Sequence, residues 1–192
     1  MLMFLVNEII ALLASNLILT QALGTSTLFI AAESRRKLVA AAGVITVFTT
    51  LGSAAAYLIN SLLGGSFDEY VLLFYTLAVG VIYIGLLTLL YAFSRKAFEK
   101  FRKYIHISAF NCAVMGTLFT IRENNPLGTE TFSLGDYVLS GFQAGAGFII
   151  AALVLGAAFG RLNSSKVPSS FRGFPAMLVY LGIISMAVYA LK

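Results

Sequence analysis

Six apolar stretches, each long enough or nearly long enough to cross a bilayer, follow one another along this chain of 192 residues. A helix needs about 20 apolar residues to cross the hydrocarbon core, and about 17 is the lower limit. Only 11% of the residues are charged, and the mean hydropathy is +0.92, whereas soluble domains carry about 25% charged residues. The sequence therefore predicts an all-α integral membrane protein with six transmembrane helices. The expected spans cover about 9–32, 38–62, 71–93, 104–121, 137–160 and 174–191.

The positive charges of the connecting segments fall almost entirely on one side of the membrane if alternate segments face alternate sides. This side collects 11 of the 13 lysines and arginines, namely Arg35, Arg36, Lys37, Arg95, Lys96, Lys100, Arg102, Lys103, Arg161, Lys166 and Arg172. Cytoplasmic loops carry an excess of Lys and Arg, so this side is expected to be the cytoplasmic one, with both termini outside. The same positions explain the net charge of +5 without a nucleic-acid partner.

The fourth apolar stretch, between Lys103 and Arg122, is a minimal span with a polar interruption. Asn111 and Cys112 lie near its middle, and Gly116 follows them. Cys112 is nine residues past Lys103, which is about 13 Å at helical rise and hence near the midplane of a core about 30 Å thick. Polar breaks at this depth are typical of functional sites in membrane proteins, so we expect a broken helix here.

The first apolar stretch contains a similar break. Residues 16–29 run from an asparagine through Gly24 to Thr-Leu-Phe, as residues 111–119 do. Ser26 lies nine residues before Arg35, so both breaks are expected at similar depth. We predict a single membrane domain, 1–192, made of two three-helix repeats, about 1–94 and 95–192. The odd number of spans per repeat makes the repeats inverted, with the first and fourth helices broken near the midplane and their breaks facing each other.

The candidate site residues are therefore the polar and small residues of these two breaks. Besides Cys112 and Ser26 they comprise Asn16, Gly24, Thr25, Asn111 and Gly116. No catalytic residue is predicted, since no triad, carboxylate pair, phosphate loop or zinc signature occurs. A single cysteine excludes an internal disulfide and a metal site built from this chain's thiolates alone. A lone cysteine is also commonly just a small buried hydrophobe, and that alternative stays open.

Other small or charged residues have structural interpretations. Glycines spaced by four, at 141 and 145 and again at 156 and 160, are expected to let helices approach closely. His106 is expected near the cytoplasmic interface, next to a basic loop at 95–103.

Three motifs resemble those of one known family. Residues 110–116 read Phe-Asn-Cys-Ala-Val-Met-Gly, residues 167–173 read Val-Pro-Ser-Ser-Phe-Arg-Gly, and residues 16–29 precede the basic Arg-Arg-Lys-Leu at 35–38. With them the chain resembles the six-span membrane subunits shared by the Rnf complexes and the sodium-pumping NADH:quinone reductase (Nqr). It is most similar to the Rnf A type, whose Nqr counterpart is the E subunit. The similarity runs through essentially the whole chain.

The resemblance implies an iron–sulfur site. In this family two oppositely oriented subunits hold a [2Fe–2S] cluster at the midplane, each giving two cysteines from its broken helices. Cys112 matches the second cysteine, and Ser26 stands where the first is expected, in Leu-Gly-Thr-Ser-Thr at 23–27. The resemblance thus implies Cys112 as an iron ligand and Ser26 as a second cofactor position, although a hydroxyl is a much poorer ligand than a thiolate.

The expected function follows from this resemblance. The chain would be a subunit of an Rnf/Nqr-type ion-translocating electron-transport complex in a bacterial or archaeal cytoplasmic (inner) membrane. It would help to carry electrons while sodium or protons move, and would bind neither nicotinamide nor substrate itself. Its partners would be a paralogous subunit, the other Rnf/Nqr subunits and the lipid bilayer. The alternative is a non-redox small transporter or structural scaffold that kept the inverted-repeat fold and lost the cluster.

Overall fold

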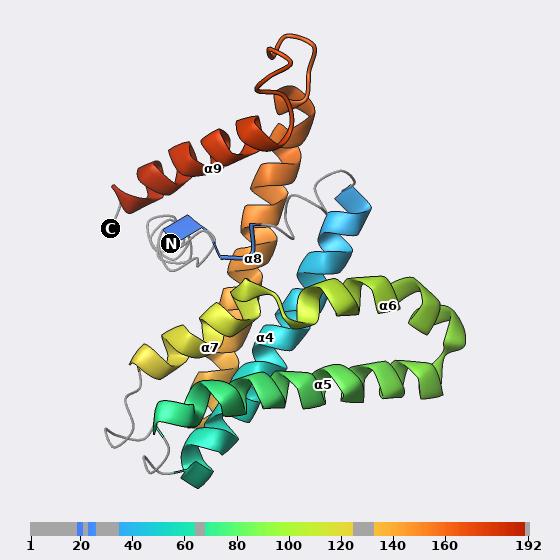
Figure 1. Ribbon diagram of the computed structural model, residues 1–192, viewed down its shortest axis with the longest axis vertical. Helices are drawn as coiled ribbons and strands as arrows, with labels where there is room; N and C mark the ends of the chain where they lie inside the picture. The colour runs from blue at the N-terminus through green and yellow to red at the C-terminus, as the bar shows by residue number, and fades with distance from the viewer. Residues whose placement is uncertain (1–18, 21–22, 26–34, 64–67, 125–132, 191–192) are drawn as a thin grey trace, which may run out of the picture.

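The computed structural model describes residues 19–20, 23–25, 35–63, 68–124 and 133–190, and within them the regular structure is helical throughout. The elements are α4 (Arg35–Leu63), the 3-10 turn η1 (Asp68–Tyr70), α5 (Val71–Phe93), α6 (Arg95–Ala109), α7 (Cys112–Asn124), α8 (Leu134–Leu162) and α9 (Phe174–Tyr189). Figure 1 shows α4 and α8 as the long axis of the molecule, with the α5–α6 hairpin extending away from them. The predicted all-α class is confirmed for the described part of the chain.

In the part of the chain that the structure describes, three helices are long and apolar enough to cross a membrane, namely α4, α5 and α8. They correspond to the spans expected at 38–62, 71–93 and 137–160. A fourth candidate is made of α6 and α7 together, which meet at a bend of 49°. Helix α9 is apolar but has 16 residues, about 24 Å at helical rise. The span expected at about 9–32 lies largely outside the described residues.

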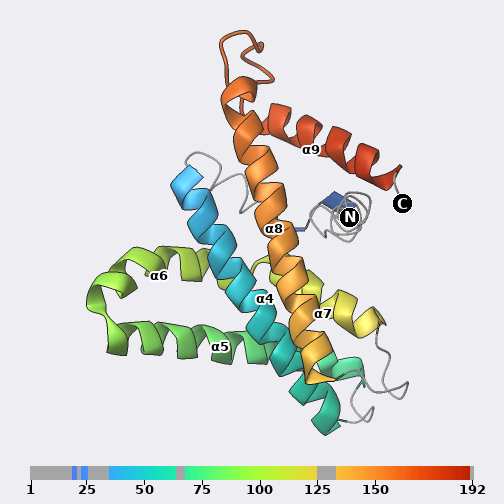
Figure 2. The same cartoon turned by 180° about the vertical axis from the view of Figure 1, so that it is seen from behind.

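The antiparallel pair α4 and α8 forms the centre of the fold, and glycines bring its backbones together (Figure 2). A Cβ atom added at Gly145 would lie 2.7 Å from the Cα atom of Thr46. One added at Gly141 would lie 2.5 Å from the carbonyl oxygen of Thr49 and would also collide with Ser53. Because real Cβ atoms do not approach backbone this closely, each glycine creates the space for α4. The predicted close approach at 141 and 145 is confirmed.

The second glycine pair of α8 behaves differently. A Cβ atom at Gly156 would meet the side chain of Leu38 at 2.8 Å, but among the described residues nothing lies within 4 Å of one at Gly160. The expected close packing is therefore seen at Gly156, near the start of α4, and at Gly160 it stays a prediction.

The basic segment at 95–103, expected to be a loop, is instead the first part of α6. Ser94 begins this helix by accepting a hydrogen bond from the backbone N–H of Ala97 at 3.4 Å. Lys, Arg and Ala favour helix strongly, and apolar residues at 97, 98 and 101 alternate with charged ones to give an amphipathic helix. Charge alone therefore suggested a loop where the pattern of apolar residues favours a helix.

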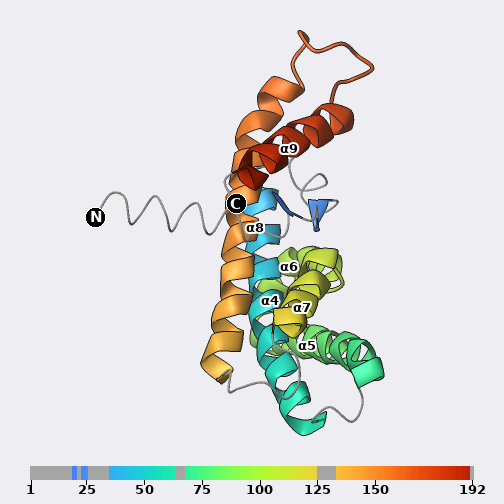
Figure 3. The same cartoon turned by 90° about the vertical axis from the view of Figure 1, so that its left-hand side faces the viewer.

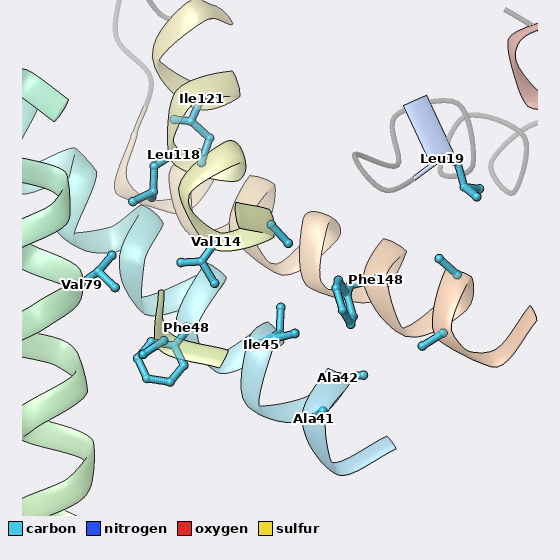
Figure 4. Close-up of a cluster of buried hydrophobic side chains, with 14 of the residues drawn as sticks. Leu19, Ala41, Ala42, Ile45, Phe48, Val79, Val114, Leu118, Ile121 and Phe148 are labelled. Carbon is cyan, nitrogen blue, oxygen red and sulfur yellow. The ribbon is translucent and has the colours of Figure 1, made fainter. Parts of the chain in front are cut away.

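Helix α7 packs into the angle between the other helices and completes the core. Its Val114 and Leu118 are almost completely buried, as are Ile45 and Phe48 of α4. Figure 4 shows this cluster lying between Val79 of α5 and Phe148 of α8. Seen from the side, α5, α6 and α7 lie on one side of the α4–α8 pair (Figure 3). The core thus fixes α7, whose first residue is Cys112, against the central pair.

A buried polar network joins three helices near one end of the central pair. The Tyr75 hydroxyl donates to Asn60 Oδ1 at 2.8 Å, and Asn60 Nδ2 donates to the Tyr137 hydroxyl at 3.1 Å. The three residues come from α5, α4 and α8, and all are buried. Buried polar groups in a membrane protein need internal partners, and Asn60 here finds one for each end of its amide. The network therefore fixes how the ends of these helices meet.

Candidate functional site

The break between α6 and α7 is built by Asn111. Its side-chain oxygen accepts from the backbone N–H of Ala113 at 3.0 Å, which is the arrangement of a helix N-cap. Its carbonyl oxygen accepts from the backbone N–H groups of Val114 and Met115, at 2.9 and 3.2 Å. Because Asn111 satisfies the first donors of α7 with its own side chain and carbonyl, the second helix can start in a new direction. The break predicted at the Asn-Cys pair is confirmed.

Cys112 is the first residue of α7, and its side chain is exposed. Its Sγ accepts a hydrogen bond from the backbone N–H of Gly24 at 2.9 Å, although the two residues are 88 positions apart. The thiol also lies 3.5 Å from Asn111 Oδ1, to which it donates. The sulfur thus sits at the positive end of a helix dipole, with the Gly24 N–H directed at it and its side chain exposed.

Gly24 forms the turn of the other break, and its approach to α7 requires glycine. Its φ is +82°, a conformation that residues with a Cβ rarely adopt. A Cβ there would also lie 2.8 Å from Ala113 Cβ and 2.8 Å from a ring carbon of Phe148. A Cβ at Gly116 would in turn collide with the side chain of Leu23. The two glycines therefore let the first break dock onto the start of α7.

The structure brings together four of the predicted site residues: Gly24, Asn111, Cys112 and Gly116. Thr25 follows Gly24 directly and is half-buried. Asn16 and Ser26 lie outside the described residues, so the predicted proximity of Ser26 to Cys112 stays a prediction.

Phe148 of α8 is the site residue that the sequence analysis missed. It is 2% exposed and packs at the position where a Gly24 Cβ would fall. In the sequence Phe148 directly follows Gly147 in a long apolar run, and no pattern separates it from the other apolar residues of that run. His106 is exposed, and its Nδ1 lies 2.6 Å from the Tyr83 hydroxyl; its expected place near the cytoplasmic interface stays a prediction.

The donor set limits what this site can hold. Within the described residues no three His, Cys, Asp or Glu side chains come together as a metal site. Cys112 is the chain's single cysteine, and an iron–sulfur cluster is held by several thiolates. The exposed sulfur therefore fits one corner of a cluster shared with a second protein chain, and the described residues do not fit a cluster held by this chain alone.

Two comparisons with known proteins found similar sequences. A model of the family described as "Rnf-Nqr subunit, membrane protein" matches residues 4–192. The A subunit of the ion-translocating oxidoreductase complex of Glaesserella parasuis serovar 5 is 27% identical, over 91% of this chain and 89% of that protein.

Proteins with the same name in other bacteria give similar values. The one from Rhodobacter capsulatus is 26% identical, over 91% of this chain and 89% of its own length. The one from Alkalilimnicola ehrlichii is 37% identical over a shorter match, 43% of this chain and 40% of that protein.

Proposed function

This chain belongs to the Rnf-Nqr family of membrane subunits, and from this premise we propose that it is the A-type membrane subunit of an ion-translocating oxidoreductase complex. The relatives that carry this name cover nine-tenths of the chain. In this role the chain helps electrons to pass through the membrane while the complex moves sodium or protons. It holds the electron-transfer site and leaves nicotinamide and other substrates to other subunits.

One observation carries the location of that site: the hydrogen bond from the Gly24 backbone to Cys112 Sγ. It joins the two polar breaks that the sequence places at membrane depth. The bond satisfies the Gly24 N–H, which needs an acceptor inside a membrane protein. It is useful to a metal ligand, because hydrogen bonds to the sulfurs tune the potential of a cluster.

We propose that Cys112 is one ligand of a [2Fe–2S] cluster shared with a paralogous, oppositely oriented subunit. When bound, such a cluster accepts and returns one electron at a time. The residues of this chain position the sulfur: Asn111 fixes the start of α7, Gly24 donates to Sγ, and Gly116 and Thr25 belong to the two segments that meet there. Asn16 and Ser26 complete the proposed lining, with Ser26 at the place of a second ligand.

The test is the iron content and the EPR spectrum of the purified complex, at a known subunit ratio. We expect about two irons per complex beyond those accounted for by the other subunits, with a [2Fe–2S] signal on reduction. A complex that is fully assembled and moves ions, yet carries no iron assignable to this subunit pair, would contradict the cluster.

That contrary result would instead favour the second candidate, a non-redox transporter or scaffold subunit. The observation in favour of this candidate is that the chain has a single cysteine, whereas subunits of this family are expected to give two each. Iron measurement thus separates the two functions directly.

We propose that the paralogous subunit meets this chain at the helix breaks, where the shared cluster would lie, with the two three-helix halves of each chain inverted in the membrane. Helix α5 exposes Val81 at 70%, Ile84 at 60% and Phe93 at 85%, and this face is left to lipid. A complex whose subunit purifies as a fully functional monomer would contradict this assembly.

The orientation of the chain is proposed from its charges, with the chain in a bacterial or archaeal cytoplasmic membrane and both termini outside. Alkaline phosphatase fused after Ser66 should be active, because that enzyme folds outside the cytoplasm, and a fluorescent protein fused there should be dark. Fusions after Lys100 should show the opposite pattern. Activities that are reversed at both positions would invert the topology.

A further inference from the structure

Helices α5 and α6 enclose an open groove with a volume of about 510 Å³. Six residues line it, namely Leu87, Thr88, Tyr91, Phe98, Arg102 and His106. The three on α6 are spaced by four residues and so lie along one face of that helix. The groove is thus apolar and aromatic along most of its length, with two basic side chains on the α6 side.

The groove has a defined shape. The Tyr91 and Phe98 rings meet edge to face with centroids 5.5 Å apart, which joins the two helices near one end. Toward the other end the Tyr83 hydroxyl lies 2.6 Å from His106 Nδ1. If the tyrosine donates, the neutral imidazole carries its proton on Nε2 and can donate it to a ligand. The two contacts thus hold both walls of the groove in place.

The charge on α6 is strongly one-sided. Its first nine residues contain five lysines and arginines and one acid, Glu99. Within the described part of the chain Arg102 is exposed and has no carboxylate partner. The planar guanidinium of Arg102 can donate two parallel hydrogen bonds to the oxygens of one phosphate. The chemistry of the groove therefore combines anion binding with hydrocarbon contact.

A ligand that has both an anionic group and a hydrocarbon chain is available where the proposed topology places the groove in the membrane. Helix α6 follows the cytoplasmic end of α5 in the proposed topology, and anionic lipids of that leaflet attract basic segments next to spans. Basic amphipathic helices lie at this interface. From the groove, an acyl chain would continue along exposed apolar residues of α5 such as Ile84 and Val81.

We propose that the α5–α6 groove is a binding site for an anionic phospholipid, with its phosphate held by Arg102 and His106 and its acyl chain against Leu87 and the α5 surface. This site is separate from the helix breaks and does not depend on the cluster. A free phosphate would use only the two basic groups, and a neutral lipid would leave Arg102 without an anion.

The experiment measures phosphatidylglycerol retained by the whole complex in phosphatidylcholine nanodiscs that contain a small fraction of phosphatidylglycerol, by quantitative mass spectrometry of the extracted lipid. Arg102→Gln should lower the affinity for phosphatidylglycerol about fivefold, the effect of about one interfacial charge. Lys96→Gln is the matched control, because it removes the same charge from an exposed residue of α6 that does not line the groove.

Four results would overturn the proposal. Equal losses for the two variants would mean a diffuse attraction to the whole basic helix, and no loss for Arg102→Gln would mean that the groove holds no lipid phosphate. Displacement of the lipid by millimolar inorganic phosphate would mean a simple anion site. Efficient cross-linking of a Leu87→Cys variant to a neighbouring protein chain would mean that protein covers the groove.

Discussion

Replacing Cys112 by alanine is expected to remove the [2Fe–2S] EPR signal assigned to this subunit pair and to stop electron transfer through the complex. The substitution takes away the chain's only thiolate, and an iron without that ligand cannot stay in the site. The folding cost should be small, about 1 kcal/mol, because the side chain is exposed. Assembly of the complex should therefore continue while its redox spectrum changes.

Two further variants make this prediction specific. Cys112→Ser keeps the size and the position at the start of α7 but exchanges the thiol for a poor ligand, so it should behave like Cys112→Ala. Ser26→Cys adds a thiolate at the position of the missing one and should strengthen the cluster signal. If Cys112→Ala leaves the redox spectrum untouched and costs only about 1 kcal/mol, the cysteine is a small packing residue.

Gly145→Ala is expected to cause a large loss of folding stability, about 3 kcal/mol. The new Cβ would lie 2.6–2.8 Å from three atoms of Thr46, one of them the backbone Cα. Backbone cannot rotate away as a flexible side chain can, so α4 and α8 would have to separate along their whole contact. The measurement is denaturant unfolding of the purified protein in detergent, together with the folded amount in membranes.

Gly160→Ala provides the matched control on the same helix. No described residue lies within 4 Å of a Cβ at Gly160, and alanine favours helix over glycine by up to about 1 kcal/mol. This variant should be neutral or slightly more stable than the parent. Equal destabilisation by the two substitutions would show that glycine flexibility matters in α8, and that close contact with α4 does not.

Local patterns in the sequence were enough to predict the three long apolar helices α4, α5 and α8 and the break at Asn111. Val71 to Phe93 is apolar throughout and lies between Tyr70 and Ser94, so hydropathy alone places both ends of α5. The Asn-Cys pair interrupts a short apolar run, and a capping residue is most useful at the start of a helix. Both features are local, and the structure places them where the sequence does.

Contacts between distant segments could not be predicted in the same way. The sequence suggested that the two breaks share a depth, but not that the Gly24 N–H would donate to Cys112 Sγ across 88 residues. That bond depends on the positive φ of Gly24 and on Phe148 packing behind it, and neither has a local signal. Helix α6 was missed for the opposite reason, because five basic residues suggested a loop while their apolar neighbours favoured an amphipathic helix.

The Asn60 network has a consequence for the biogenesis of the protein. Tyr75 follows Asn60 by 15 residues and Tyr137 follows it by 77, so the ribosome delivers the nearer tyrosine first. An asparagine amide without a hydrogen-bond partner in lipid costs free energy. The first partner available to Asn60 is Tyr75 of α5, within the α4–α5 hairpin. The second bond forms only when α8 arrives, and the tight glycine contact then closes around α4. The order of synthesis thereby becomes an order of assembly, in which the α4–α5 hairpin forms before α8 completes the central helix pair.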